Sequence, residues 1–269
     1  MIYSTVEELK ADFEGRRAHL NFFDANAWVG FQVEPAYNRI CKTDELLKEL
    51  SLSNINEAIV THTGALYYNL VEGNELTLEA ISGQEQLYGA VVLSPNTTGE
   101  LGQTKEYIDR AIKRKARIAR LFPKLHTFCL QPWCAGSVLE ALQERRIPLM
   151  LWHSETDWNE VHSLCQSYPN LPIIIEGTGR KILYDNRMFY RLLSLHKNLH
   201  LEIHCLTNCR ILEEMVGMLG AEQFIFGSYL PYKEPAVTMM LLAYSGISDD
   251  AKRLIAGGNI RRLLEEVRI

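Results

Sequence analysis

Short apolar segments alternate with longer amphipathic segments along the whole chain. The apolar segments are rich in Ile, Leu, Val and Phe, and Ser94-Pro95-Asn96 closes the third of them. Short apolar runs bounded in this way predict buried β-strands. Eight strands are predicted, over residues 19–25, 57–62, 87–93, 116–122, 148–153, 172–176, 199–205 and 224–228.

The segments between the predicted strands carry apolar residues at helical spacing. Residues 137–146 and 157–168 are examples, and another helix is predicted to begin near Thr43. The chain ends in a further predicted helix, for which Asn259 is the expected N-terminal cap.

Strands that are apolar on both faces, each followed by a helix, predict a parallel sheet covered by helices. Eight such units favour a closed (β/α)8 TIM barrel, and an open doubly wound sheet is the alternative with the same local pattern. No glycine-rich phosphate motif follows the first predicted strand, which argues against a dinucleotide-binding fold. The 269 residues match the roughly 250 of such a barrel, so we expect residues 1–269 to form a single domain.

Composition narrows the classes of function. The chain is 47% hydrophobic, 23% charged and has a net charge of −5, which argues against a nucleic-acid-binding surface. The N-terminal residues do not resemble a signal peptide, and no apolar run has the length of a membrane span. We therefore expect a cytoplasmic protein whose partner is a small molecule, not nucleic acid or membrane. The sequence leaves a homo-oligomer open.

The six cysteines do not form a disulfide framework in a chain of this length, and a reducing compartment would keep them as thiols. Cys205 and Cys209 are four positions apart. Without a second pair at metal spacing, we interpret them as two partly buried thiols.

The active site of a parallel barrel lies at the carboxyl ends of its strands. A polar group at the end of an apolar strand is costly unless it has a partner or faces a cavity. The rule therefore selects a set of candidate residues before any family is considered: Asn26, Trp28, His62, Asn96, Arg120, Phe122, His153, Glu155, Glu176, His204, Ser228 and Tyr229.

Several stretches resemble the amidohydrolase-related (amidohydrolase 2 type) barrels. DANAW at 24–28 is similar to their D-x-H-x-H opening, and IPLMLWH at 147–153 resembles their fifth strand, which ends in a metal-binding histidine. YPNLPIIIEG at 168–177 is similar to their sixth strand. FGSYLP at 226–231 resembles their F-G-S-D-x-P strand, and GGN at 257–259 their closing helix.

The departures from that family fall on its metal ligands. Asn26 and Trp28 stand at the two first-strand histidines, Glu176 at the sixth-strand histidine and Tyr229 at the eighth-strand aspartate. In the family, that aspartate binds metal and takes the proton from the attacking water. Of the usual ligands only His153 is retained, whereas a hydrolytic zinc site needs about three protein ligands. We therefore expect no metal and no other cofactor.

Two interpretations stay open for each main candidate. His153 is a ligand or acid–base group, or a pocket histidine bonded to Glu176. Glu176 serves function in the pocket, or forms a structural ion pair with Arg120. Arg120 binds an anion, or is one more charge of the basic run at 113–117. Strand alternation separates Arg120 from Ala119 but does not say which of the two faces the interior.

The other histidines are less informative. His204 shares a strand face with Glu202, which favours function, whereas His62 is interpreted as a loop histidine with a pocket role as the alternative. Asp24 is expected to hold the first-strand turn. The remaining histidines are predicted to lie on the surface: His19, His126, His162, His196 and His200.

Three functions follow, and the sequence does not decide among them. The leading hypothesis is an atypical hydrolase- or lyase-like barrel for a small carboxylated or carbonyl substrate. Glu176 and His153 would provide acid–base chemistry, and Arg120 would hold an anion, with Asn26, Trp28, His62, His204 and Tyr229 lining the substrate site.

The second hypothesis is a barrel without catalysis that binds a small molecule, for which Trp28 and Tyr229 are suited. The third is a hydrolase with a rearranged divalent metal site, zinc for example. Its ligands would be His153, Glu176 and His204, with His62 as a further candidate.

Overall fold

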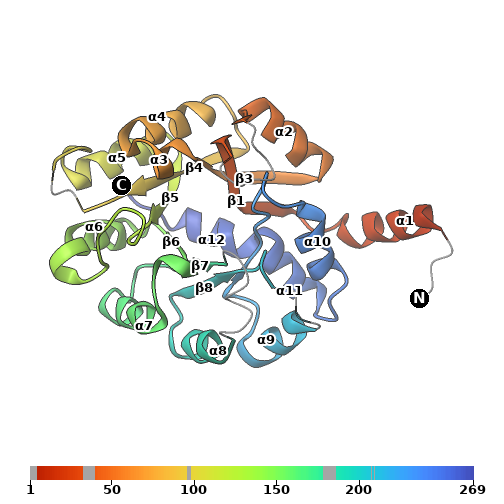
Figure 1. The fold of residues 1–269 in the computed structure, drawn as a ribbon. Helices are drawn as coiled ribbons and strands as arrows, with labels where there is room; N and C mark the ends of the chain where they lie inside the picture. The colour runs from red at the N-terminus through yellow and green to blue at the C-terminus, as the bar shows by residue number, and fades with distance from the viewer. Residues whose placement is uncertain (1–4, 33–39, 96–97, 178–185, 207, 209) are drawn as a thin grey trace.

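The computed structural model of this protein describes residues 5–32, 40–95, 98–177, 186–206, 208 and 210–269. Within these ranges nine strands form one sheet in the order β2-β1-β3-β4-β5-β6-β7-β8-β9. Eight of the strands run parallel, and the short β2 pairs antiparallel with β1. Figure 1 shows the strands around a common centre with most helices outside them, whereas the C-terminal helix crosses the centre of the view and the N-terminal helix extends away from the barrel. The strands are β1 (Phe22–Phe31), β2 (Ile40–Cys41), β3 (Ile55–His62), β4 (Leu87–Leu93), β5 (Ala116–Leu121), β6 (Leu149–Trp152), β7 (Ile173–Glu176), β8 (Leu199–Glu202) and β9 (Phe224–Ile225).

Backbone hydrogen bonds between β1 and the residues after β9 close the sheet. Ala25 N donates to Phe226 O over 3.1 Å, and Trp28 N donates to Leu230 O over 2.8 Å. The predicted (β/α)8 TIM barrel is therefore confirmed, and the open doubly wound alternative is wrong.

Helices connect successive strands and cover the outside of the barrel (Figure 1). The predicted helix at 157–168 is present, with the Asp157 side chain accepting hydrogen bonds at its N-terminus, whereas the helix predicted at 137–146 begins earlier. The helices are α1 (Val6–Arg17), α2 (Thr43–Leu52), α3 (Gly64–Tyr67), α4 (Leu70–Ala80), α5 (Thr104–Lys113), α6 (Pro132–Arg145), η1 (His153–Glu155), α7 (Trp158–Ser167), α8 (Asn186–Leu195), α9 (Ile211–Leu219), α10 (Pro235–Ala243), α11 (Asp249–Arg253), η3 (Leu254–Gly258) and α12 (Asn259–Glu265). None of the described helices is long and apolar enough to cross a membrane.

Two expected boundaries need correction. The first strand begins and ends later than predicted, because its polar residue Asn26 finds partners inside the barrel and does not end the strand. Asn259 does not cap the last helix, since the π-helical turn η3 leads into α12 without a break. Its buried Nδ2 instead donates to Ala221 O over 2.7 Å and Phe224 O over 2.8 Å, which anchors α12 to β9.

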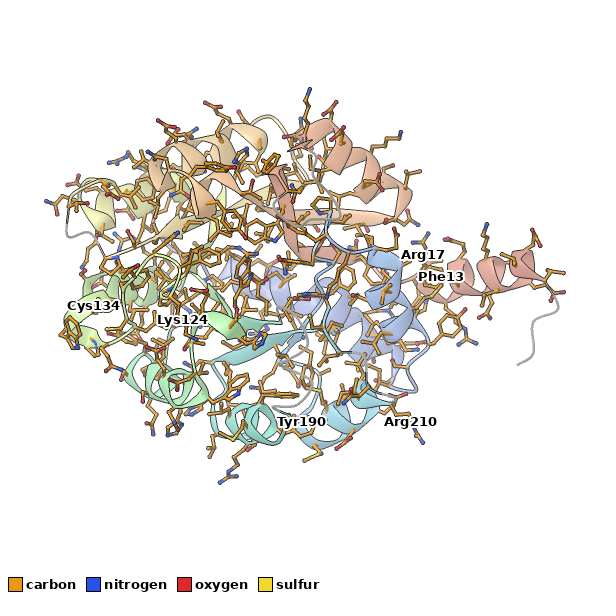
Figure 2. The ribbon with its side chains drawn as sticks, viewed as in Figure 1. Phe13, Arg17, Lys124, Cys134, Tyr190 and Arg210 are labelled. Carbon is orange, nitrogen blue, oxygen red and sulfur yellow. The ribbon has the colours of Figure 1, made fainter. Side chains whose placement is uncertain are left out.

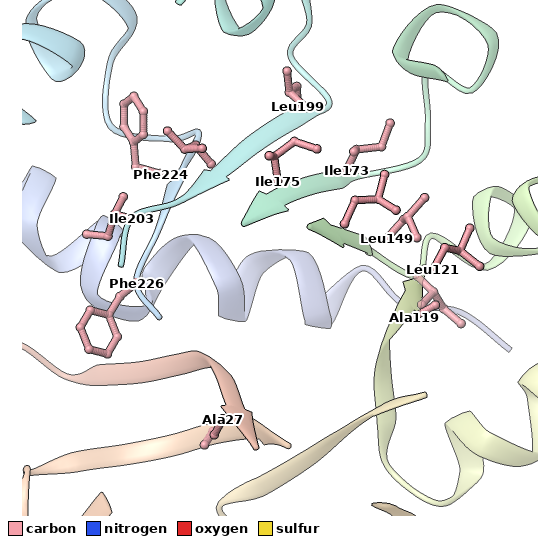
Figure 3. Packing of buried hydrophobic residues seen from close by; sticks show 14 of the residues in the cluster. Ala27, Ala119, Leu121, Leu149, Ile173, Ile175, Leu199, Ile203, Phe224 and Phe226 are labelled. Carbon is pink, nitrogen blue, oxygen red and sulfur yellow. The ribbon is translucent and has the colours of Figure 1, made fainter. Parts of the chain in front are cut away.

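The barrel interior is layered, with an apolar floor. Phe23, Ile59, Ile118 and Ile174 point inward from four strands and pack against Ile260 of α12. Outward-facing residues of the strands pack under the helices, and Figure 3 labels Leu149, Ile173, Ile175 and Leu199 among them. Polar candidates on the inward face therefore lie above the floor, toward the carboxyl ends of the strands.

Two histidines that were expected on the surface are buried. His200 shares the inward face of β8 with Glu202, near the floor of the barrel, and burial lowers its pKa to about 3. His196 follows α8, and its Nε2 lies 2.7 Å from His162 Nδ1 on α7. Histidine has an apolar body, so a strand or helix end can bury it when one ring nitrogen has a partner.

Candidate active site

An ion pair occupies the barrel interior above the apolar floor. Arg120 comes from β5 and Glu176 from the end of β7, and both side chains are 0% exposed. Arg120 Nη1 donates to Glu176 Oε1 over 2.5 Å, and Nη2 donates to Asn26 Oδ1 over 3.0 Å. The guanidinium carbon lies 4.5 Å from the centre of a Trp28 ring, within cation–π distance. Arg120 thus faces inward. The ion pair with Arg120, which was the alternative predicted for Glu176, is present.

Asn26 joins this ion pair to a second acidic residue. Its Nδ2 donates to Glu176 Oε2 and also lies 3.4 Å from Glu202 Oε2 on β8. Its Oδ1 accepts from Trp28 Nε1 over 2.8 Å as well as from Arg120. One amide from β1 therefore bridges residues from β5, β7 and β8, which holds four strands in register at the mouth.

Glu202 and His204 form a second buried pair. The His204 backbone N donates to Glu202 Oε1 over 2.7 Å, and its ring Nδ1 is bonded to Glu202 Oε2. A Cβ at position 227 would lie 2.5 Å from Glu202 Oε1, so the carboxylate fits only because this position, two residues after the end of β9, is a glycine. Sequence analysis predicted that Glu202 and His204 lie on the same strand face. Because Nδ1 of His204 is bonded to Glu202, Nε2 points away from that carboxylate.

Burial and neighbouring charges set the protonation of these groups. Burial raises the pKa of Glu176 above its ordinary value, although the Arg120 guanidinium acts in the opposite direction. Burial by itself would lower the pKa of His204, but the Glu202 carboxylate outweighs it, and the pKa of His204 is raised to about 10. His204 is therefore an imidazolium at neutral pH.

We expect this protonation to be visible in solution. Because the pKa of His204 is higher in the folded chain than in the unfolded one, the pair stabilises the fold fully below about pH 6.5. That contribution is lost as the pH rises through about 10. In NMR titrations of the ring, wild-type His204 should titrate near pH 10. Glu202→Gln should lower that midpoint, because the carboxylate that opposes burial is removed while the contact with Cys205 remains. A wild-type midpoint at or below about 6.5 contradicts this assignment.

An aromatic layer covers the polar network. Trp152 lies 5.9 Å from Trp28 and 4.9 Å from Phe122, measured between ring centres. Tyr229 stacks on the His204 ring at 5.0 Å with the planes 11° apart. Its backbone adopts a φ of 63°, which is rare for a residue other than glycine. Backbone strain of this kind occurs often at functional sites.

Cys205 and Lys233 complete the rim beside His204. Cys205 Sγ lies 3.1 Å from His204 Nε2, and Lys233 Nζ donates to the same sulfur over 3.2 Å. Lys233 is exposed, and its Nζ lies 5.9 Å from the centre of the Tyr229 ring. Sequence analysis missed this cluster, although polar residues directly after a barrel strand are the available signal. Cys209 lies outside the described residues.

Asp24 braces the mouth from within β1 and does not hold a turn, because the strand continues to Phe31. Its Oδ1 accepts from Asn26 N over 2.9 Å and from Ser228 N over 2.8 Å, and Oδ2 accepts from the Ser228 hydroxyl. Burial raises the pKa of Asp24 to about 6, although these hydrogen bonds lower it. Asp24 thus ties β1 to the segment after β9 at the seam of the barrel.

The structure places the remaining predicted site residues differently from one another. His153 is buried in η1, directly after β6 and at the same end of the barrel as Glu176. His62 alternates with the inward-facing Ile59 and Thr61, so its ring points to the outer side of β3, where Nδ1 accepts from Gly64 N over 3.0 Å. His62 is therefore not brought together with the others. Asn96 lies outside the described residues.

The described residues of this network do not fit a divalent metal ion. The Glu176 oxygens accept from Arg120 and Asn26, and the Glu202 oxygens accept from His204. A metal ion beside Glu176 would also meet the guanidinium charge at close range. Across the described ranges, no group of three or more His, Cys, Asp or Glu side chains is placed to hold a metal ion.

Some buried polar atoms of the mouth lack a partner within the part of the chain that the structure describes. They are Arg120 Nε, Trp152 Nε1 and Thr61 Oγ1. An unsatisfied buried donor costs about 1–3 kcal/mol. Two of the three are N–H donors around the Trp28 ring, and donors of this kind bind the oxygens of an anion.

A groove of about 1070 Å³ lies beside the mouth. It is lined by the segments after β3, β4 and β5 and by the start of α6, including Tyr68, Lys124, His126 and Trp133. Trp133 is 83% exposed. The groove therefore offers aromatic surface off the barrel axis. Ala65 and Leu66 of its lining pack in the same cluster as Trp28 and Tyr229.

Comparison with known proteins supports the fold. No family model and no curated protein matches the sequence. A 5-carboxyvanillate decarboxylase from Sphingomonas paucimobilis superposes with a TM-score of 0.70 at 14% identity, covering 91% of this chain and 99% of its own. The chain has the fold of these barrels. A structure named amidohydrolase II superposes with a TM-score of 0.69 at 13% identity, covering 91% of this chain and 100% of its own.

A further match is the 5-carboxyvanillate decarboxylase from Novosphingobium aromaticivorans, whose structure holds manganese and 4-hydroxy-3-methoxy-5-nitrobenzoic acid. It has a TM-score of 0.72 at 11% identity and covers 92% of this chain and 96% of its own. The likeness agrees with the resemblance found in the sequence and, at this identity, shows the fold alone.

Proposed function

We propose that the protein is an enzyme of hydrolase or lyase type that acts on a small carboxylated or carbonyl compound without a resident metal ion. One observation carries this proposal: the oriented Glu202–His204 pair lies in the same barrel mouth as unpaired buried N–H donors. The pair supplies a proton-transfer group, and the donors supply an anion site.

The anion site would consist of Arg120 and Trp152. Their Nε and Nε1 atoms are the N–H groups of the mouth that lack partners among the described residues, and a substrate carboxylate would satisfy both. Glu176 and Asn26 would act as positioning residues, because they hold the other two guanidinium nitrogens. The aromatic layer of Trp28, Trp152 and Tyr229 would enclose the substrate body.

His204 would donate a proton to the reacting group. Its imidazolium is stabilised by Glu202, and Tyr229 fixes the plane of the ring. An imidazolium is a general acid, and the imidazole that remains can take the proton back. His153 at the end of β6 is retained as a second candidate for proton transfer. Glu176, first considered as the base, is already bonded to Arg120 and Asn26 through its two oxygens.

The similar barrels support the substrate class. Two of them are named as decarboxylases of 5-carboxyvanillate, a carboxylated aromatic compound. We propose small aromatic carboxylates as the first compounds to test, because an aromatic ring would stack on Trp28, Trp152 or Tyr229 while its carboxylate meets the donors.

A binding barrel without catalysis is the second candidate. The observation that favours it is the closed network, in which the side chains of Arg120, Asn26 and Glu202 are buried and bonded to one another. The off-axis groove with its exposed Trp133 would then be the ligand site.

The test is a library of small aromatic carboxylates and lactones, screened by thermal shift and then by turnover of the hits. We expect at least one hit to be consumed, at a rate that EDTA does not change. Hits that bind but are never consumed would leave the binding barrel as the better account. Turnover that EDTA abolishes and manganese or zinc restores would instead support the rearranged metal site.

A further inference from the structure

The Cys205 sulfur is surrounded by polar groups from three segments. His204 Nε2 lies 3.1 Å from Sγ, and Lys233 Nζ, from the segment after β9, lies 3.2 Å from it. The Gly177 carbonyl, directly after β7, is also 3.1 Å from Sγ. Two potential cations, from two different segments, therefore face one sulfur atom.

The imidazole that faces the sulfur is held in place. Glu202 binds Nδ1 on the far side of the ring, and Tyr229 stacks on its face. A nucleophile, a base and a third group that orients the base form the arrangement of covalent hydrolases. Here the three are Cys205, His204 and Glu202, with Lys233 as an additional cation that reaches solvent.

We infer that Cys205 is a reactive nucleophile, activated by His204 and Lys233 at the rim of the barrel mouth. Its ligands would be small electrophiles, such as alkyl halides, activated esters and lactones. The reactivity itself does not depend on the proposed substrate class.

Ester or lactone hydrolysis through Cys205 rests on the proposed function. The sulfur would form a bond to the carbonyl carbon while the carbon–oxygen bond of the leaving group breaks. The leaving oxygen would take a proton from His204. Water would then hydrolyse the thioester. Its hydroxyl group would leave in the carboxylic acid, and its other proton would return to the pair formed by Cys205 and His204.

Other cysteines of the same chain serve as internal controls. Cys129 and Cys134 are half-buried and line the off-axis groove, and Figure 2 places Cys134 on the α6 side of the barrel. Both are more exposed than Cys205, so exposure alone predicts that they react faster. Cys165 is buried, and burial raises its pKa to about 12, so it should be the least reactive thiol of this set.

The experiment follows alkylation by iodoacetamide at each cysteine through peptide mass spectrometry. In this step Sγ bonds to the methylene carbon, iodide leaves and the thiol proton passes to solvent. Cys205 should react at least tenfold faster than Cys134 in the folded protein, and the difference should vanish in urea. Lys233→Met, a change of an exposed residue, should slow Cys205 at least threefold and leave Cys134 unchanged. His204→Gln should slow Cys205 at least tenfold.

A Cys205 rate equal to or below that of Cys134 overturns the inference, and so does a rate that neither substitution changes. Sγ would then be a neutral thiol donating to the Gly177 carbonyl. A fast Cys205 in a protein that consumes none of the library compounds would refute the proposed function and leave this inference standing. Turnover with an unreactive Cys205 would do the reverse.

Discussion

Replacing Arg120 with methionine should lower the free energy of unfolding by about 3–5 kcal/mol. Methionine keeps most of the side-chain volume but removes the charge that faces Glu176 in an environment with no solvent exposure. The Glu176 carboxylate would then be buried without its counter-ion, and Asn26 Oδ1 would lose a donor. Urea unfolding followed by circular dichroism measures the change.

Two matched variants separate the buried pair from a general effect of charge removal. Arg114→Met removes the 2.5 Å contact with Glu75 on the surface, and we expect a change below about 1 kcal/mol. The double variant Arg120→Met with Glu176→Met removes both charges, and it should recover much of the loss because apolar replacement of a buried pair is tolerated. An Arg120→Met protein as stable as the wild type would show that the pair does not form.

Replacing His204 with glutamine should reduce turnover of a screened substrate by about 10²- to 10⁴-fold, the usual contribution of a general acid–base group. Substrate affinity should stay within about tenfold, or roughly 1.4 kcal/mol, because the anion site of Arg120 and Trp152 is untouched. Steady-state kinetics together with equilibrium binding of the same compound separates the two effects.

His200→Gln is the matched control, because His200 lies on the inward face of the same strand but near the barrel floor. This substitution should leave the turnover rate within about threefold of the wild-type rate, because the catalytic residues of this fold lie at the carboxyl ends of the strands. Glu176→Gln tests positioning: it should raise KM more than it lowers kcat, because Arg120 loses the carboxylate that orients it. Turnover that survives His204→Gln would remove His204 from the mechanism.

The alternation of strands and helices was predictable from the sequence because local chemistry determines it. Runs such as Pro172-Ile173-Ile174-Ile175-Glu176 are apolar on both faces, which is stable only inside a sheet covered by helices. The exact strand ends were less predictable. Strand one continues through Asn26, and this depends on partners from β5 and β7 that no local pattern contains.

The sequence predicted those candidate residues whose position at the end of a strand places them at the mouth of the barrel. Arg120, Glu176, His204 and Tyr229 follow from the rule that a parallel barrel gathers polar groups at its carboxyl ends. His62 obeys the same rule but points outward, because the two-residue period of a strand relates neighbouring side chains without saying which face is inside. The assignment of His200 to the surface failed for the same reason. His196 is buried for a different one, since it follows α8 and its ring meets His162 of α7.

The sequence by itself determined the alternation of strands and helices, and the count of eight strand–helix units favoured the closed barrel over an open sheet. Only the tertiary structure decided that Arg120 faces inward against Glu176, and that Lys233 reaches Cys205 from a separate segment. Hydrophobic periodicity involves residues that are close in the sequence, so the sequence alone reveals it. Pairing between charged side chains depends on distances across the barrel, which exist only after the sheet has closed.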